Sequence, residues 1–130
     1  MLVNNNIISL QEYTLPFGSF QFFPGYVTCY IDDAVDLDED KLLQFYALCS
    51  DVYQAERFAV IELRLCSYSV DPSFYIKHSD LLSQVKGHAM VVAGTAPAQL
   101  SEFEALCIKH CPYGVFYSLS EAISWAAQQP

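Results

Sequence analysis

Cysteine and histidine are the side chains that could hold a zinc ion, and three of them lie close together in the sequence. Cys107 and Cys111 are one helical turn apart, with His110 between them. A structural zinc site needs four ligands, usually supplied as two pairs. No second pair of ligands is visible in the sequence. Cys66 and His88 are only loose candidates for one. We therefore expect buried, unreactive thiols here and no metal.

Catalysis by a nucleophile would require a base at a recognisable spacing from it. His78 falls on an apolar helical stripe, which favours a packed histidine, and no Ser, Cys or acid stands at motif spacing from it. The glycines are isolated, so no phosphate-binding loop is present. An enzyme would need a cleft in which at least two members of a small set converge. That set is His78, His88, Cys66, Asp71 and Glu62. We expect no catalytic residues, no cofactor and no enzymatic activity.

A run of aspartates could indicate calcium. Its members are Asp32, Asp33, Asp36, Asp38 and Asp40. A calcium loop of the EF-hand kind needs a central Gly and a distal Glu at fixed offsets, and neither is in register here. Helix capping explains the cluster more simply.

Charge and composition limit the classes of partner. Fifteen acidic and six basic residues give a net charge of −9, which repels nucleic acids and anionic membranes. No apolar run approaches the roughly 20 residues that span a bilayer. Five irregularly spaced cysteines and the lack of a secretory segment predict reduced thiols in a cytoplasmic protein. An apolar share of 53 % predicts a globular chain.

The N-terminal third has the alternation of β-strands. Alternating apolar residues over 20–22 and 26–31, on either side of Pro24-Gly25, predict a hairpin. Residues 7–13 are either a further edge strand or an ordered arm. The sequence does not decide between these two.

Helices and strands alternate after the hairpin. Asp36 with Glu39 resembles a capping box and predicts the start of a helix. Residues 58–65 form a strand pattern, and Asp71-Pro72 predicts the start of a second helix, which Gly87 ends. The expected order then continues with a buried strand, a helix, a strand and a last helix. These begin near Ala89, Thr95, Val115 and Ser118.

This order predicts an α/β fold: an N-terminal hairpin, then repeated βα units with a mostly parallel sheet. We expect one domain over residues 1–130, with 1–24 as strands or an arm and 25–128 as the core. Two strands carry polar or aromatic residues at alternate positions, which predicts two layers with helices mainly on one face. The other face is then a candidate interaction surface. Its residues are Tyr26, Thr28, Tyr30, Glu62 and Arg64.

Three motifs follow one another in an order that a known family shares. The strand 59–63 leads into Val70-Asp71-Pro72-Ser73, and the strand 90–94 leads into Thr95-Ala96-Pro97-Ala98. Residues 115–123 then combine an aromatic strand with Ser and Glu-Ala. Over roughly residues 25–128 the chain resembles the STAS family, best known from bacterial anti-sigma-factor antagonists. Its ending, Ala122-Ile123-Ser124-Trp125, is similar to that of uncharacterised bacterial STAS-like proteins.

The resemblance implies a regulatory position. In phosphorylated STAS proteins a Ser at the second helix start is modified, and Ser73 is the matching residue here. A phosphate would add up to two negative charges near helix N–H donors. This chain departs from the family where Phe74-Tyr75-Ile76 replaces a Gly-Leu-Gly segment. An ordinary first-turn serine is therefore the alternative.

Three functions stay open at this point. The first is a non-enzymatic interaction or regulatory module that docks a protein, or a second copy, through the aromatic face or the loops with Asp71, Ser73 and Thr95. The second is a domain that binds a small apolar ligand or lipid. The third is an enzyme built on the convergent set named above.

Overall fold

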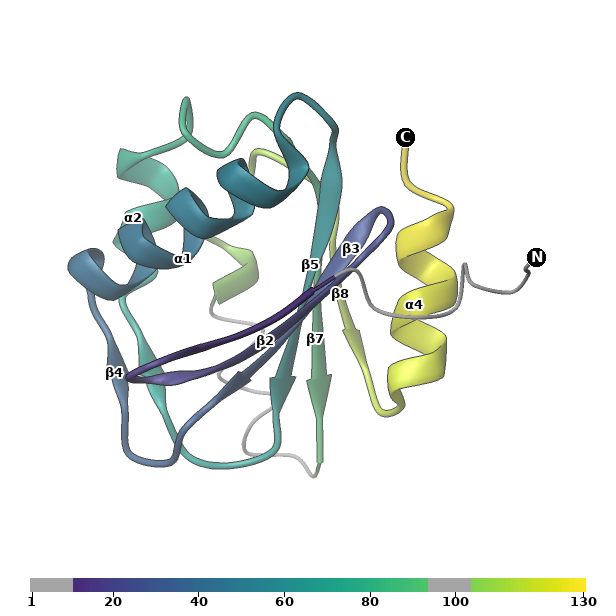
Figure 1. The fold of residues 1–130 in the computed structure, drawn as a ribbon. Coiled ribbons are helices and arrows are strands. Elements are labelled where there is room, and N and C mark those ends of the chain that lie inside the picture. Colours follow the sequence, from purple (N-terminus) through teal and green to yellow (C-terminus); the bar gives the residue numbers. More distant parts are fainter. Residues whose placement is uncertain (1–10, 94–103) are drawn as a thin grey trace.

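A mixed six-stranded sheet lies at the centre of the molecule (Figure 1). The computed structural model describes residues 11–93 and 104–130. The strands of this sheet are β1 (Gln11–Leu15), β2 (Gly18–Phe23), β3 (Tyr26–Ile31), β5 (Phe58–Arg64), β7 (Val85–Val92) and β8 (Tyr113–Phe116). Their spatial order is β1-β2-β3-β5-β7-β8, with the first two pairings antiparallel and the other three parallel. The predicted α/β class with a mostly parallel sheet is confirmed.

The antiparallel part of the sheet follows from two tight turns. The predicted hairpin is confirmed, since β2 and β3 pair around Pro24 and Gly25. Gly25 has a φ of 85°, in the left-handed region that glycine adopts without a steric penalty. β1 adds a further antiparallel strand, so an edge strand and not an arm occupies residues 11–15.

Helix α1 (Glu39–Tyr53) packs on one face of the sheet. Its N-cap is Asp38, whose carboxylate accepts a backbone N–H bond of 3.0 Å from the first turn. The sequence predicted a start at Asp36, but that residue belongs to β4 (Asp36–Leu37). β4 pairs in parallel with β6 (Ser69–Val70) in a separate two-stranded sheet. The extra strand pairing moves the helix start two residues along the chain.

The second helix is much shorter than its apolar stripe predicted. α2 covers only Ser73–Lys77, and turns fill the chain up to residue 84. Gly87 does not end a helix, because it lies inside β7. A Cβ at Gly87 would stand 3.2 Å from the Trp125 ring, so close packing, and not a turn, favours glycine there.

The C-terminal elements agree with the sequence where the structure describes them. The predicted helix start at Thr95 lies outside the described residues. β8 begins two residues earlier than expected. The last helix, α4 (Leu119–Ala127), is capped as predicted, because Ser118 Oγ accepts the backbone N–H of Glu121 at 3.2 Å.

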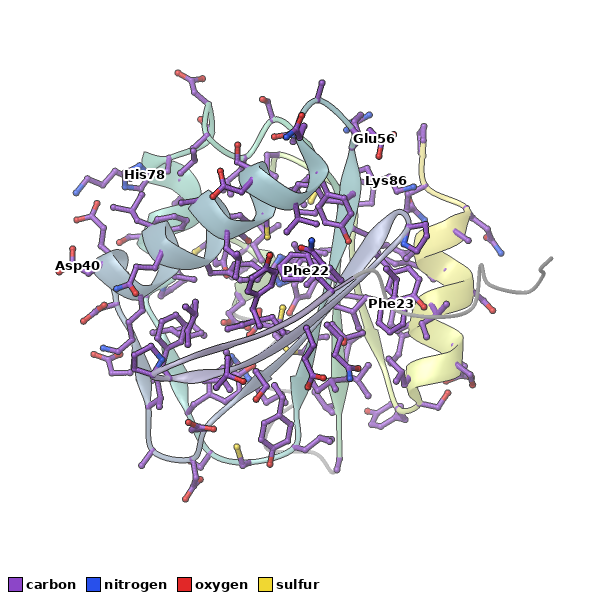
Figure 2. All side chains as sticks on the ribbon, viewed as in Figure 1. Phe22, Phe23, Asp40, Glu56, His78 and Lys86 are labelled. Carbon is purple, nitrogen blue, oxygen red and sulfur yellow. The ribbon has the colours of Figure 1, made fainter. Side chains whose placement is uncertain are left out.

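Helices lie on both faces of the sheet, which corrects the two-layer prediction. α1 and α2 cover one face, and α4 covers the part of the other face that β5, β7 and β8 form (Figure 1). Phe22 and Phe23 are neighbours in β2 and point to opposite faces (Figure 2). α4 rests on β5, β7 and β8 through apolar side chains, several of which are alanines. These are Ala59, Ile61, Ala89 and Val91 from the strands, against Ala122 and Ala126 from the helix.

The outward placement of Glu62 and Arg64 is also corrected. The strand register puts Glu62 beside Cys29 and Val60 beside Val27, so Glu62 faces the main core under α1 and α2. Glu62 is 5 % exposed and Arg64 is 4 % exposed. β5 lies in the middle of the sheet with helices on both faces, so its polar side chains have no solvent-facing side.

Candidate functional site

Exposed apolar side chains gather where the strands reach their carboxyl ends. Tyr30 is 43 % exposed near the end of β3, and Leu65, directly after β5, is 54 % exposed. Tyr117, directly after β8, is 66 % exposed, and Leu119 at the start of α4 is 38 % exposed. We call these four residues the carboxyl-edge patch. Neighbouring strands are about 4.8 Å apart, so the patch spans roughly 15 Å from β3 to β8.

A buried carboxylate organises the interior behind this patch. Glu62 Oε2 accepts a hydrogen bond of 2.5 Å from the hydroxyl of Tyr68, which lies in the loop after β5. Glu62 Oε1 lies 2.9 Å from His88 Nε2 on the neighbouring strand β7. His88 is 1 % exposed, so the pair has no contact with bulk water. Both oxygens of the Glu62 carboxylate are therefore engaged.

A second buried ion pair extends this network. Arg64 donates a hydrogen bond of 3.0 Å to Glu104, and both side chains are buried. The Arg64 guanidinium also lies 4.7 Å from the centre of the Tyr68 ring, a cation–π distance. Tyr68 and Glu104 come from the segments that follow β5 and β7. The network therefore ties these two segments to the sheet beside the patch.

The two buried carboxylates differ in proton affinity. Burial raises the pKa of Glu62, but the hydrogen bond and charge of His88 and the charge of Arg64 outweigh it, so the pKa lies below its ordinary value. Burial and the neighbouring Glu62 charge raise the pKa of Glu104 to about 7, and Arg64 offsets this only in part. Opposite shifts in paired carboxylates occur in acid–base sites as well as in structural networks.

Three atoms of the network lack a hydrogen-bond partner within residues 11–93 and 104–130. These are Nδ1 of His88, Nε of Arg64 and Oε1 of Glu104. The core beside Glu62 holds a cavity of about 20 Å³, otherwise lined almost entirely by apolar side chains. A space of that size admits about one water molecule. It is too small for an organic substrate or a lipid.

A separate groove opens on the surface between α2 and residues 104–110. Its volume is about 280 Å³. Its lining residues are Tyr75, Ile76, Ser79, Cys107, Lys109 and His110. The His110 ring stacks on Tyr75 with centres 6.3 Å apart, and neither of its nitrogens has a partner in the described part of the chain. Burial lowers the pKa of His110 to about 4, so the ring is neutral at pH 7.

The residues predicted from the STAS resemblance lie away from the buried network. Ser73 is exposed, and its hydroxyl donates a hydrogen bond of 2.7 Å to Asp71. Asp71 also accepts the backbone N–H of Ser73 at 3.1 Å, but the N-cap of α2 is Pro72 and no side chain caps the helix, so the cap lies one residue further along the chain than predicted. Thr95 lies outside the described residues.

The predicted aromatic face is only partly open. Tyr30 is exposed, but Thr28 is 6 % exposed, and Tyr26 is half-buried with its ring stacked on Phe23. Of the five residues that an enzyme would need to bring together in a cleft, only Glu62 and His88 are in contact. His78 instead pairs with Glu39, with 2.6 Å between Nε2 and Oε2.

The thiols form no cluster among the described residues. All five cysteines are free, and no group of three or more metal-ligating side chains occurs in residues 11–93 and 104–130. Burial raises the pKa of Cys111 to about 12, so this thiol stays protonated and unreactive at neutral pH.

Sequence reasoning missed Tyr68 and Glu104 as partners of the central strand. One signal for the network was present: Glu62 and Arg64 alternate within an otherwise apolar strand, and His88 stands in the next parallel strand. Polar residues on a strand that is buried on both faces need partners, and an acid beside a histidine supplies one.

Comparison with known proteins finds no matching family model, no matching curated protein and no matching solved structure. None of the helices in the described residues has the length and hydrophobicity that crossing a membrane requires.

Proposed function

We propose that this chain is a STAS-like, non-enzymatic interaction module of the cytoplasm that docks a protein through its carboxyl-edge patch. The observation that carries the proposal is the exposure of Tyr30, Leu65, Tyr117 and Leu119 at one edge of the sheet. Exposed apolar groups collected at one place favour association, because their burial releases about 25 cal/mol per Å². The order of the βα units supports the STAS-like part of the proposal.

The buried network supports a structural role over a catalytic one. Glu62 and His88 are the groups best suited to proton transfer, and they contact each other in the core instead of a cleft. A general base must reach its substrate within hydrogen-bond distance. In this proposal the network holds the loops of the patch in one geometry.

A phosphate on Ser73 would act on the turn that begins α2. The Ser73 hydroxyl is bonded to the Asp71 carboxylate, so a phosphoryl group would stand beside a like charge. We infer that a switch at this position would release the turn and shift α2, in place of binding helix N–H donors.

Capture from an extract of the native host tests the docking proposal. The full chain carrying an affinity tag is compared with Leu65→Asp and Tyr117→Asp, which place a charge on the patch. Ile76→Asp and Leu106→Asp are matched controls, because these residues are 63 % and 65 % exposed elsewhere on the surface. A protein captured by the wild type and both controls, but not by the patch variants, supports the proposal. Equal capture by all five proteins contradicts it.

Light scattering on the same variants covers the case in which the partner is a second copy. A dimer that Leu65→Asp converts to a monomer, while Ile76→Asp does not, identifies the patch as a self-association surface.

A small, largely apolar ligand is the second candidate, and the groove beside His110 favours it. A volume of about 280 Å³ approaches the size of small-molecule sites, and the groove combines apolar walls with a few polar groups. Anilinonaphthalene sulfonate, an apolar fluorescent anion, is a suitable probe. Its fluorescence should rise with the wild type and with Leu65→Asp, but not with Ile76→Asp. Equal fluorescence for both variants excludes the groove as the binding place.

A further inference from the structure

The sheet ends at β1, and the outer side of this strand has no strand partner within residues 11–93 and 104–130. β1 is exposed along nearly its whole length, and Tyr13 is 38 % exposed. Proteins usually protect such an edge with lysine, a bulge or a proline within the strand. β1 has neither Lys nor Pro, its single charged side chain is Glu12, and its pairing with β2 is regular.

The register shows which backbone groups this edge offers. Leu15 and Gly18 close a two-residue turn, so they exchange both hydrogen bonds, and Tyr13 does the same with Phe20. Hydrogen-bonded and non-bonded pairs alternate along an antiparallel ladder. The N–H and C=O groups of Glu12 and Thr14 therefore point outward. They form a short, regular template for an added strand.

The charge of the chain is concentrated in the part that carries this edge. Residues 1–40 contain seven acids and no Lys or Arg, whereas residues 41–130 contain eight acids and six bases. The seven acids are Glu12, Asp32, Asp33, Asp36, Asp38, Glu39 and Asp40. The first 40 residues thus supply −7 of the net charge of −9.

The fold brings the acidic run to the turn end of β1. The backbone carbonyl of Phe17, in the β1–β2 turn, accepts the N–H of Asp32 at 3.0 Å. The Phe17 side chain lines the same cavity as Leu37 and Leu42. Asp40 stands at the outer end of α1, on the same side of the molecule as β4 (Figure 2). A segment that extends past this end of β1 therefore meets a negative field.

We propose that the outer edge of β1 binds an extended, basic segment of a partner protein by strand addition. Backbone hydrogen bonds to Glu12 and Thr14 supply the pairing, and the acids supply the preference for lysine and arginine. Side chains alternate across a strand. One set of the partner's side chains lies beside Glu12 and Thr14, and the other lies beside the half-exposed ring of Tyr13.

A second copy of this chain is a poor occupant for the same edge. Two-fold pairing of β1 would bring together two regions that each carry seven acids and no base. Like charges at an interface oppose association and discriminate against the wrong partner. The inference does not rest on the carboxyl-edge patch, because β1 is at the opposite end of the strand order from β8.

Fluorescence anisotropy with labelled peptides tests the proposal on the full chain. The probe is a peptide of about eight residues that alternates Lys and Val, and the matched control alternates Glu and Val. We expect the lysine peptide alone to bind, with an affinity that falls as NaCl rises from about 50 mM to about 300 mM. The absence of binding by the lysine peptide overturns the proposal, as does equal binding of the two peptides.

Two variants and one matched control then locate the binding. Thr14→Pro removes an outward N–H without breaking a bond to β2, and it should weaken binding by roughly tenfold or more. Thr14→Val keeps that N–H and should bind as the wild type does. Glu12→Lys should lower the affinity for the lysine peptide even if Thr14→Pro fails to fold, which circular dichroism reveals. Unchanged affinity in folded Thr14→Pro, or in Glu12→Lys, overturns the proposal.

The two interaction proposals fail independently. Leu65→Asp leaves β1 intact and should bind the lysine peptide normally, so its loss of capture concerns only the patch. Light scattering of the free chain gives a further outcome: a dimer that Thr14→Pro dissociates means that a second copy occupies the edge, which overturns the basic-segment assignment.

Discussion

At the scale of single residues, the buried carboxylate of Glu62 has the largest expected effect on stability. Glu62→Ala removes the acceptor for Tyr68 and the partner of His88, and leaves the Arg64 charge less compensated. Removing one partner from a buried charged network typically costs about 3–5 kcal/mol. Tyr68→Phe deletes a single hydroxyl and should cost about 1–3 kcal/mol. Urea denaturation of both variants measures the difference, and equal costs would show that the network is not centred on Glu62.

Glu104 gives the stability a pH dependence of known sign. Its pKa is about 7 in the folded chain and ordinarily near 4.5, so the folded state binds the proton more tightly. The stabilisation that Glu104 contributes to the folded state is complete below about pH 4.5. It is lost as the pH rises through about 7. The loss over that window should be on the order of 1–3 kcal/mol.

Glu104→Gln keeps an acceptor for Arg64 but cannot titrate. We expect its free energy of unfolding to fall less than that of the wild type between pH 5 and pH 7. Urea titrations at several pH values provide the measurement, with His110→Gln as the control for the opposite effect. The pKa of His110 is lowered to about 4, so its contribution is present above pH of about 6.5 and is lost as the pH falls through 4. Parallel wild-type and Glu104→Gln curves would contradict the assignment.

At the scale of elements, α4 packs closely against the sheet at Gly87. An added Cβ would meet the Trp125 ring at 3.2 Å and Gln129 Cγ at 3.1 Å. Gly87→Ala should therefore destabilise the protein by about 1–2 kcal/mol through overpacking. Trp125→Leu removes the crowded ring, and Gly87→Ala added to it should cost much less. A double-mutant cycle measured by thermal unfolding checks this, and additive costs would rule out the Gly87–Trp125 contact as the cause.

The elements themselves were largely predictable, because they follow from local chemistry. The Pro24-Gly25 turn, the parallel βα order and the Ser118 cap were each visible in the sequence. The start of α1 was not, since two residues that resemble a cap instead pair with a distant strand, β6. The sequence predicted that Gly87 ends a helix, but glycine stands at this position because of a close tertiary contact with α4. Contacts between segments far apart in the chain override local patterns of this kind.

The candidate site was predictable only in part, for the same reason. The alternation of Glu62 and Arg64 with apolar residues predicts a strand with one solvent-facing side. Only the position of β5 between two helical layers shows that both residues are buried. Tyr68 and Glu104 carry no local signal for their partners. The carboxyl-edge patch depends on where Leu65 and Tyr117 fall after their strands, and single-residue boundaries are the least predictable feature of a sequence.

At the scale of the whole molecule, the uneven charge opposes folding and should make stability depend on salt. With net charge −9, raising NaCl from about 20 mM to about 300 mM shortens the Debye length from roughly 20 Å to roughly 6 Å and screens the repulsion among the acids. We expect the urea midpoint of the wild type to rise over this range. Asp32 is exposed in the acidic run, so Asp32→Lys should be more stable at low salt by about 0.5 kcal/mol and less sensitive to salt.

Lys109→Glu is the matched control, because it is also an exposed charge reversal but adds to the net negative charge. It should lower the urea midpoint at low salt and increase the gain that NaCl produces. If repulsion is spread evenly over the surface, the two variants change the midpoint by equal amounts in opposite directions. If it is concentrated around residues 1–40, as the charge distribution indicates, Asp32→Lys has the larger effect. A wild-type midpoint that does not change with NaCl would mean that the acidic region is too well solvated to affect folding, and its excess charge would then serve association alone.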